Sequence, residues 1–139
     1  MFPADTKFLI VDDFATMRRI IKKNLTELGF TNIEEADDGA TAWPMIESAL
    51  KNGTPYQCII SDWNMPKLQG IDLLKNVRAN ASLKALPFML VTAESEQQQI
   101  LTAVKAGVSD YVIKPFNAVT LKQKLESVWN KYNRQAKTA

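Results

Sequence analysis

Short, continuously apolar segments alternate along the chain with longer segments in which apolar residues recur at helical spacing. The first short segment is Phe8–Val11, which we interpret as a buried strand because all four residues are apolar. Apolar residues from Met17 to Leu28 follow it three or four positions apart, and Gly29 is a typical helix stop. The alternation repeats along the chain and predicts strands at 8–11, 32–36, 58–61, 87–91 and 111–113.

Apolar residues that would share one face mark the helices between and after these strands. They are Met17, Ile20, Ile21, Leu25 and Leu28 in the first helix, Ile71, Leu74 and Val77 in the third, Ile100, Leu101 and Val104 in the fourth, and Leu121, Leu125, Val128, Trp129 and Tyr132 in the last. The second helix should span 39–50, with Pro44 in its first turn or at a kink. Gly107 should end the fourth helix. Five βα units joined by right-handed crossovers predict an α/β fold, a doubly wound parallel sheet with helices on both faces.

Length and composition agree with a single globular domain over residues 1–139. The chain has 139 residues, of which 46% are hydrophobic and 23% charged. No apolar run approaches the roughly 18 residues that a membrane span needs. The first residues lack the pattern of a signal peptide. We therefore expect a soluble, cytoplasmic protein with no membrane partner.

Charge and the missing residue types narrow the possible chemistry. A net charge of +2 does not indicate nucleic-acid binding, and we interpret the basic residues Lys131, Arg134 and Lys137 as a solvated end. The single cysteine, Cys58, lies in an apolar run and excludes an intramolecular disulfide. The absence of histidine excludes Ser-His and Cys-His catalysis and most zinc sites. Any chemistry must therefore use carboxylates, hydroxyls and lysine.

Polar residues follow four of the five predicted strands. Asp12 and Asp13 follow the first, Asp62 the third, Thr92 the fourth and Lys114 the fifth. Ligands of an open parallel sheet bind outside the carboxyl ends of the strands, so these groups should converge. Three neighbouring carboxylates disfavour full ionisation, and a hard divalent cation such as Mg²⁺ would relieve this. A carboxylate there could accept a phosphoryl group, with the lysine neutralising charge and the threonine donating a hydrogen bond.

Each of these residues also has an ordinary structural interpretation. Asp13, before Phe14, could cap a helix, and Thr92 suits a strand. An isolated lysine at position 114 would usually be solvated, and Tyr111 could be a simple strand aromatic. The convergence of four separate segments favours the chemical interpretation.

Four segments resemble the receiver domains of response regulators. They are Phe8–Phe14, Asp62–Pro66, Val91–Glu94 and Tyr111–Phe116, and they look specifically like those of the single-domain chemotaxis regulators. The resemblance runs from about Lys7 to Tyr132. It implies a flavodoxin-like (βα)5 fold with strand order 2-1-3-4-5, a core over about 7–132 and short tails.

The resemblance implies a phosphorylation site and a metal site. Asp62 would be phosphorylated by a histidine kinase of the chemotaxis type. Asp13 and Asp62 would bind Mg²⁺ directly, with the backbone carbonyl of Asn64 as a third ligand, and Asp12 would reach the ion through water. The protein would turn over no external substrate.

The resemblance also implies a conformational switch. Lys114 would pair with the phosphoryl group after a cis Lys114–Pro115 peptide bond. Thr92 would move to contact the phosphoryl group and Tyr111 would turn inward. The output face would comprise Ile100, Val104, Tyr111, Ile113 and Lys124. The partner of this face would be the flagellar motor switch protein. A phosphatase could act on the phosphorylated Asp62. We expect the protein to be a monomer.

Two departures from the chemotaxis regulators leave the target open. The segment from Asn52 to Gln57 is longer than usual, and the segment 94–99 and Ser127 lack lysines that are common there. A phosphate sink or a regulator of another target is therefore an alternative. A Mg²⁺-dependent phosphatase of the haloacid dehalogenase type is another, although Asn64 stands where it needs a second aspartate. A transcription factor would need a DNA-binding domain, and few residues follow the last predicted helix.

Overall fold

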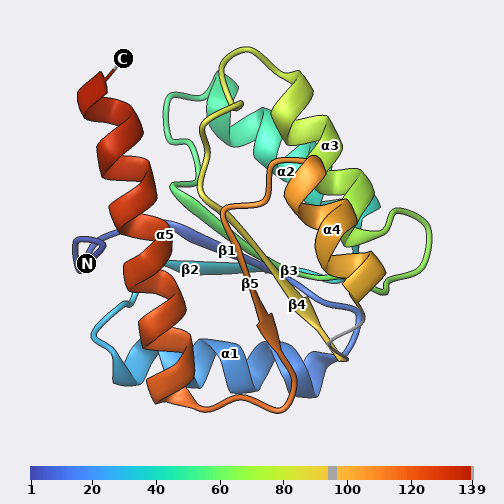
Figure 1. The fold of residues 1–139 in the computed structure, drawn as a ribbon, viewed down its shortest axis with the longest axis vertical. Helices are drawn as coiled ribbons and strands as arrows, with labels where there is room; N and C mark the ends of the chain where they lie inside the picture. The colour runs from blue at the N-terminus through green and yellow to red at the C-terminus, as the bar shows by residue number, and fades with distance from the viewer. Residues whose placement is uncertain (94–96, 139) are drawn as a thin grey trace.

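The computed structural model describes residues 1–93 and 97–138. Five strands and five helices alternate: β1 (Phe8–Val11), α1 (Ala15–Glu27), β2 (Ile33–Ala36), α2 (Gly39–Lys51), β3 (Cys58–Asp62), α3 (Gly70–Ala79), β4 (Phe88–Thr92), α4 (Gln97–Lys105), β5 (Asp110–Ile113) and α5 (Ala118–Thr138). The strands form one sheet in the order β2-β1-β3-β4-β5, and all pairs are parallel. Figure 1 shows α1 and α5 on one side of the sheet and α2, α3 and α4 on the other. The predicted doubly wound fold and strand order are confirmed.

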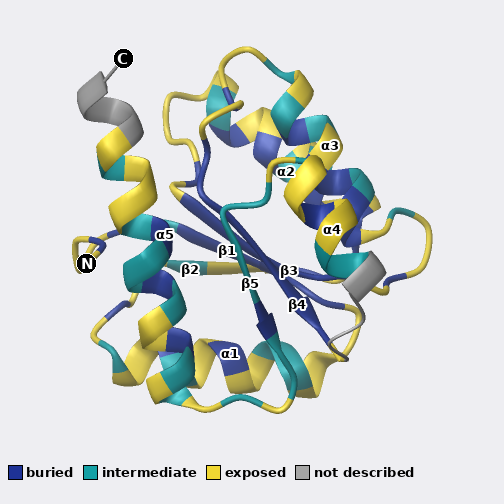
Figure 2. Ribbon diagram, in the orientation of Figure 1, coloured by how far each residue is buried: buried dark blue, intermediate teal, exposed yellow. Residues whose placement is uncertain are grey.

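The sheet separates two hydrophobic cores. Successive strand residues point to opposite faces, so Leu9 and Ile59 pack with α2, α3 and α4, whereas Phe8 and Ile60 pack with α1 and α5. Every residue of β1, β3 and β4 is buried, as the dark blue strands of Figure 2 show. The edge strand β2 is largely exposed. Continuous apolar runs in the sequence therefore correspond to the strands covered on both faces.

Two element boundaries differ from the sequence prediction in a way that matters for the site. Asp62 and Thr92 are the last residues of β3 and β4 rather than the residues after them. Helix α1 begins after Phe14, whose side chain makes no capping hydrogen bond, so the interpretation of Asp13 as a helix cap is wrong. The carboxylate of Asp13 is thus not used to cap the helix.

Pro44 lies in the second turn of α2, so the expected first-turn position is wrong, and the alternative, a kink at Pro44, stays a prediction. Its ring nitrogen cannot donate a hydrogen bond to the carbonyl of Ala40. Both residues are exposed, so water can reach that carbonyl. The solvent-facing position explains why a proline is tolerated inside this helix.

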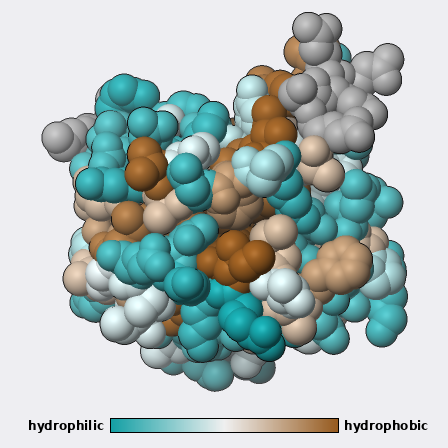
Figure 3. Space-filling model, turned by 90° about the horizontal axis from the view of Figure 1, so that it is seen from below, coloured by the Kyte–Doolittle hydropathy of each residue, from teal (hydrophilic) through white to brown (hydrophobic). Residues whose placement is uncertain are grey.

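Some apolar residues on the predicted helix faces remain exposed. Ile20 of α1 is 42% exposed and Tyr132 of α5 is 36% exposed. Figure 3 looks at the molecule from below and shows hydrophobic groups lying among hydrophilic ones. No helix in the described part of the chain is both long and apolar enough to cross a membrane. Residues 94–96 of the lysine-free segment, and the side chains of Gln97, Gln98 and Lys137, lie outside the described part.

Candidate functional site

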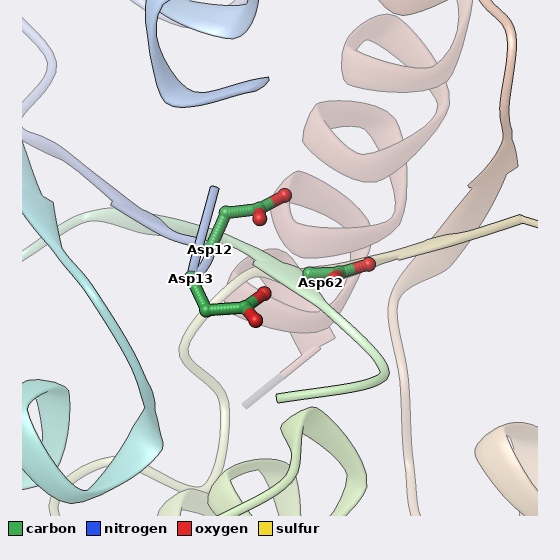
Figure 4. Close-up of side chains that lie close together, drawn as sticks. All are labelled: Asp12, Asp13 and Asp62. Carbon is green, nitrogen blue, oxygen red and sulfur yellow. The ribbon is translucent and has the colours of Figure 1, made fainter. Parts of the chain in front are cut away.

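Three carboxylates converge at the carboxyl ends of β1 and β3. Figure 4 shows the side chains of Asp12, Asp13 and Asp62 turned toward a common space. One oxygen from each lies within 4.8 Å of the other two. Strands β1 and β3 are neighbours, and their register pairs Val11 with Ser61. Asp62 therefore lies beside Asp12 and Asp13 at the same edge of the sheet, although fifty positions separate it from Asp12 in the sequence.

Asp12 is the most buried of the three acids. Its side chain is fully buried, and its Oδ1 accepts a hydrogen bond of 2.9 Å from the backbone N–H of Phe14. Its Oδ2 is buried and accepts no hydrogen bond from any residue that the structure describes. The Nζ of Lys114 lies 3.8 Å from this oxygen. A buried oxygen with spare acceptor capacity fits a place where an ion or an ordered water binds.

Lys114 brings a positive charge to the same space. Its Nζ lies 3.1 Å from Oδ1 of Asp62 and forms a hydrogen bond with it. Its backbone N–H donates to the carbonyl of Thr92 at 2.7 Å, which continues the pairing of β5 with β4. The Lys114–Pro115 peptide bond is cis, as the family resemblance implies. The lysine thus bridges the ends of β3, β4 and β5.

Burial makes the charged forms of two of the acids unfavourable. Desolvation raises the pKa of Asp12 from 3.8 to about 6, and the charges of Asp62 and Asp13 add to this, while the Phe14 hydrogen bond and Lys114 oppose it. Desolvation also raises the pKa of Asp62, against the attraction of Lys114. A bound cation would offset both effects. The donors are carboxylate oxygens with no histidine or free cysteine among them, which fits Mg²⁺.

Comparison with known proteins identifies the family of the chain. The model of the response regulator receiver domain matches residues 8–126. The chain belongs to the response regulator receiver family. This receiver is 54% identical over 125 residues to the chemotaxis protein CheY-3 of Vibrio cholerae serotype O1. The aligned residues cover 90% of this chain and 92% of the relative. It is also 54% identical over 127 residues to the chemotaxis protein CheY of Pseudomonas aeruginosa, covering 91% of this chain and 98% of that protein.

The fold of the receiver agrees with solved structures of such proteins. The structure of the chemotaxis response regulator CheY4 of Vibrio cholerae matches with a TM-score of 0.79 at 31% identity, covering 89% of this chain and 98% of that one. The receiver is therefore a CheY-like response regulator of two-component signalling. The family match and the asparagine at position 64 leave the haloacid dehalogenase alternative without support.

The predicted switch residues Thr92 and Tyr111 contact side chains of α4 and α5. Thr92 is buried, and its hydroxyl donates a hydrogen bond of 3.2 Å to Oε1 of Gln99 in α4. Tyr111 is half-buried in β5, and the ammonium of Lys124 lies 4.8 Å from the centre of its ring. Lys124 also pairs with Asp110 at 3.4 Å. These contacts connect the strand ends to α4 and α5.

The predicted output face is partly exposed. Val104 is 60% exposed, and Ile100, Tyr111, Ile113 and Lys124 are half-buried. Leu101, which sequence reasoning placed among the core-facing residues of the fourth helix, is 58% exposed and extends the face. In α4 the buried apolar contact is made by Ala103 instead. Helical spacing alone did not distinguish the two sides of a short helix with apolar residues on both.

Two residues that support the site were missed by sequence reasoning. A Cβ atom on Gly70 would lie 2.1 Å from the carbonyl oxygen of Asp62, and the N–H of Gly70 donates to the carbonyl of Trp63 at 3.0 Å. Gln99 is the other, through its bond with Thr92. The position of Gly70 at the start of a helical pattern could have suggested a close approach of two backbones. No sequence signal indicates the partner of Thr92.

Proposed function

We propose that this receiver is phosphorylated on Asp62 by a histidine kinase of the chemotaxis type, in a Mg²⁺-dependent reaction, and that phosphorylation switches its output face. The observation that carries the proposal is the meeting of Asp12, Asp13 and Asp62 within 4.8 Å, with the ammonium of Lys114 3.1 Å from Asp62. Acidic groups with one lysine and a nearby hydroxyl are the components that phosphoryl transfer to a carboxylate needs.

Asp13 and Asp62, with the backbone carbonyl of Asn64, would hold the Mg²⁺, and Asp12 would contact it through water. Asn64 is an exposed residue on the loop after β3, two positions after Asp62. Bound there, the ion would neutralise the carboxylates and the charge on the transferring oxygens.

The residues of the chain carry the transfer itself. A carboxylate oxygen of Asp62 attacks the phosphorus of the donor while the bond from phosphorus to the leaving group breaks, and the leaving group departs with the electron pair. The ammonium of Lys114, already beside Asp62, pairs with a phosphoryl oxygen. Hydrolysis of the acyl phosphate returns the receiver to its first state, so no external substrate is turned over.

The switch follows from the single proton of the Thr92 hydroxyl. That proton is directed to Gln99, and it must leave Gln99 to bind a phosphoryl oxygen. The movement would loosen the contact with α4 and allow Tyr111 to turn inward. Moving the ratio of active to inactive conformation from 1:99 to 99:1 would need roughly 5.5 kcal/mol of differential stabilisation. Phosphate oxygens bound by Thr92 and Lys114 supply part of it.

The flagellar motor switch protein is the partner that we propose for the output face. The relatives with 54% identity are chemotaxis proteins, and the exposed Leu101 and Val104 offer apolar contact area on α4. The lysine-free segment 94–99 favours the second candidate, a phosphate sink or a regulator of another target.

The test measures binding of the amino-terminal peptide of the motor switch protein with Mg²⁺, with and without beryllofluoride, a mimic of the phosphoryl group. Fluorescence of Trp63, which is adjacent to Asp62, reports occupancy of the site, and a Trp63→Phe variant shows which signal belongs to it. Asp62→Asn should abolish activation. Asp5→Asn, which removes an exposed carboxylate elsewhere, is the matched control and should behave as wild type.

The outcomes separate the two parts of the proposal. Peptide binding that tightens on activation and depends on Asp62 supports a motor-directed regulator. Occupancy of the site without peptide binding supports the chemistry and the non-motor alternative. If neither Mg²⁺ nor beryllofluoride changes the Trp63 signal, and the receiver takes up no phosphoryl group from a small acyl phosphate, the proposed function is wrong.

A further inference from the structure

A pocket of about 260 Å³ opens at the amino ends of β4 and β5, at the opposite end of the sheet from the aspartates. Its walls come from the end of α3, the α3–β4 connection, the α4–β5 turn and the later turns of α5, which Figure 1 shows rising to the upper left. Three of its lining residues are cationic, Arg78, Lys84 and Lys131, and no acidic residue lines it. Three separate segments thus deliver positive charge to one concave place.

The three cations have no carboxylate partner within the part of the chain that the structure describes. The ion pairs found there involve other lysines and arginines, around β2, α1, the aspartate site and β5. Arg78 is half-buried, and a partly buried charge is normally matched by an opposite one. The pocket therefore holds positive charge that the described residues do not balance.

Hydrogen bonds fix the position of the Arg78 guanidinium. Its Nε donates to the carbonyl of Gly107 at 2.7 Å and its Nη1 to the carbonyl of Leu86 at 2.7 Å. Its Nη2 lies 3.4 Å from Oγ of Ser109. Each of the two terminal nitrogens carries a second N–H group. The guanidinium is thus held in place and still has donors to offer.

Ser109 and Lys131 add further donors. Oγ of Ser109 accepts hydrogen bonds from the backbone N–H of Phe88 at 3.0 Å and from Arg78, so its own proton is left to donate, and the described residues give it no acceptor. Nζ of Lys131 donates to the carbonyl of Ser109 at 2.8 Å and has two more N–H groups. A pocket rich in positively charged donors, without a carboxylate, is complementary to an oxyanion.

An apolar cavity of about 490 Å³ adjoins this basic pocket and shares Ala85 and Tyr132 with it. Aromatic rings form part of its wall: Trp129 lies 5.0 Å from Phe2 and 6.0 Å from Tyr132 between ring centroids. The volume falls in the range of roughly 300–1,000 Å³ that small-molecule pockets occupy. A ligand that spans both pockets needs an anionic end and a flat apolar body.

We propose that the two adjoining pockets bind a small aromatic phosphate of mononucleotide size. Its phosphate lies among Arg78, Lys84 and Lys131, and its ring lies against Trp129 and Tyr132. A dianionic phosphate balances three cations better than a monoanionic carboxylate does, and its several oxygens match the several donors. Two compact pockets suit one small molecule rather than an extended peptide. The site lies at the other end of the sheet from Asp62 and does not depend on the proposed phosphorylation.

The test uses adenosine 5′-monophosphate as the probe, titrated calorimetrically into the full chain without metal. Adenosine and inorganic phosphate are titrated separately, and each should bind more weakly because each fills only one pocket. The double variant Lys84→Gln/Lys131→Gln should weaken binding of the monophosphate about tenfold or more, since it removes two charges from the pocket. Lys75→Gln/Lys122→Gln removes two exposed lysines that line neither pocket and is the matched control, with unchanged affinity expected.

Circular dichroism and Mg²⁺ binding at the aspartate site confirm that both double variants are folded. Unchanged binding by Lys84→Gln/Lys131→Gln would show that the probe binds elsewhere and would overturn the proposal. Absence of monophosphate binding at millimolar concentration overturns it as well. So does the case in which only an acidic peptide with aromatic residues binds this face, because the surface would then be a peptide site.

Discussion

Replacement of Gly70 by alanine should disturb the phosphoacceptor strand through a single methyl group. Gly70 is the first residue of α3, and a Cβ there would lie 2.1 Å from the carbonyl oxygen of Asp62 and 3.0 Å from Cδ2 of Leu90. The first distance is about 0.9 Å below the 3.0 Å that real Cβ contacts respect. The methyl group meets backbone there, so the end of β3 or the start of α3 must move.

The expected cost is about 1–3 kcal/mol of unfolding free energy, the usual range for overpacking a close-packed core. Gly70 does not have a positive φ, so alanine suffers no backbone strain of its own there. The higher helix propensity of alanine offsets less than about 1 kcal/mol. The destabilisation should therefore arise from the contact, and the contact involves Asp62 itself.

Urea unfolding without metal measures the stability, and titration of the Trp63 fluorescence measures Mg²⁺ affinity. Gly53→Ala is the matched control. Gly53 has a φ of +78° and nothing within 4 Å of its Cβ position, so alanine should cost roughly 1–2 kcal/mol through backbone strain alone. Only Gly70→Ala should weaken Mg²⁺ binding. Wild-type stability and Mg²⁺ affinity in Gly70→Ala would refute the reasoning.

Three further predictions concern the charges and the switch. Because the pKa of Asp12 is raised from 3.8 to about 6 by folding, the folded state holds a proton between about pH 4 and pH 6 that the unfolded state has lost. The contribution of Asp12 to the metal-free stability should therefore fall by roughly 3 kcal/mol as the pH rises through this range. The stability difference between wild type and Asp12→Asn should show this slope, and a pH-independent difference contradicts it. Lys114→Met should lower the unfolding free energy of the metal-free receiver by roughly 1–3 kcal/mol near neutral pH, because it leaves Asp62 without its cation. In urea unfolding with saturating Mg²⁺, the difference in unfolding free energy between wild type and Lys114→Met should be smaller. An equal loss with and without Mg²⁺ would argue against this. Gln99→Ala removes a competitor for the Thr92 hydroxyl, so beryllofluoride affinity should rise about twofold to tenfold, and a fall would show that Gln99 instead supports the active state.

Much of the fold could be predicted because local patterns are strong in this chain. The continuous apolar runs became β1, β3 and β4, which are covered on both faces. Gly29 and Gly107, with φ values of +98° and +89°, stand beyond the ends of α1 and α4 as the pattern predicted. Ile20 and Leu101 were misplaced because spacing alone does not show which side of a helix faces water.

The sequence by itself determined the elements, their order and the kinds of side chain at the strand ends. It placed Asp12, Asp62 and Lys114 at equivalent ends of strands, and from this their convergence could be expected. That inference needs only the parallel direction of the strands, which the pattern of alternating strands and helices implies.

Only the tertiary structure decided how these side chains meet. It left Oδ2 of Asp12 buried 3.8 Å from Lys114, directed Thr92 to Gln99, and gathered the cations Arg78, Lys84 and Lys131 around one pocket. The physical reason is that these contacts join segments far apart in the chain, and their distances depend on strand register, helix rotation and rotamers. Local residue patterns encode none of these quantities.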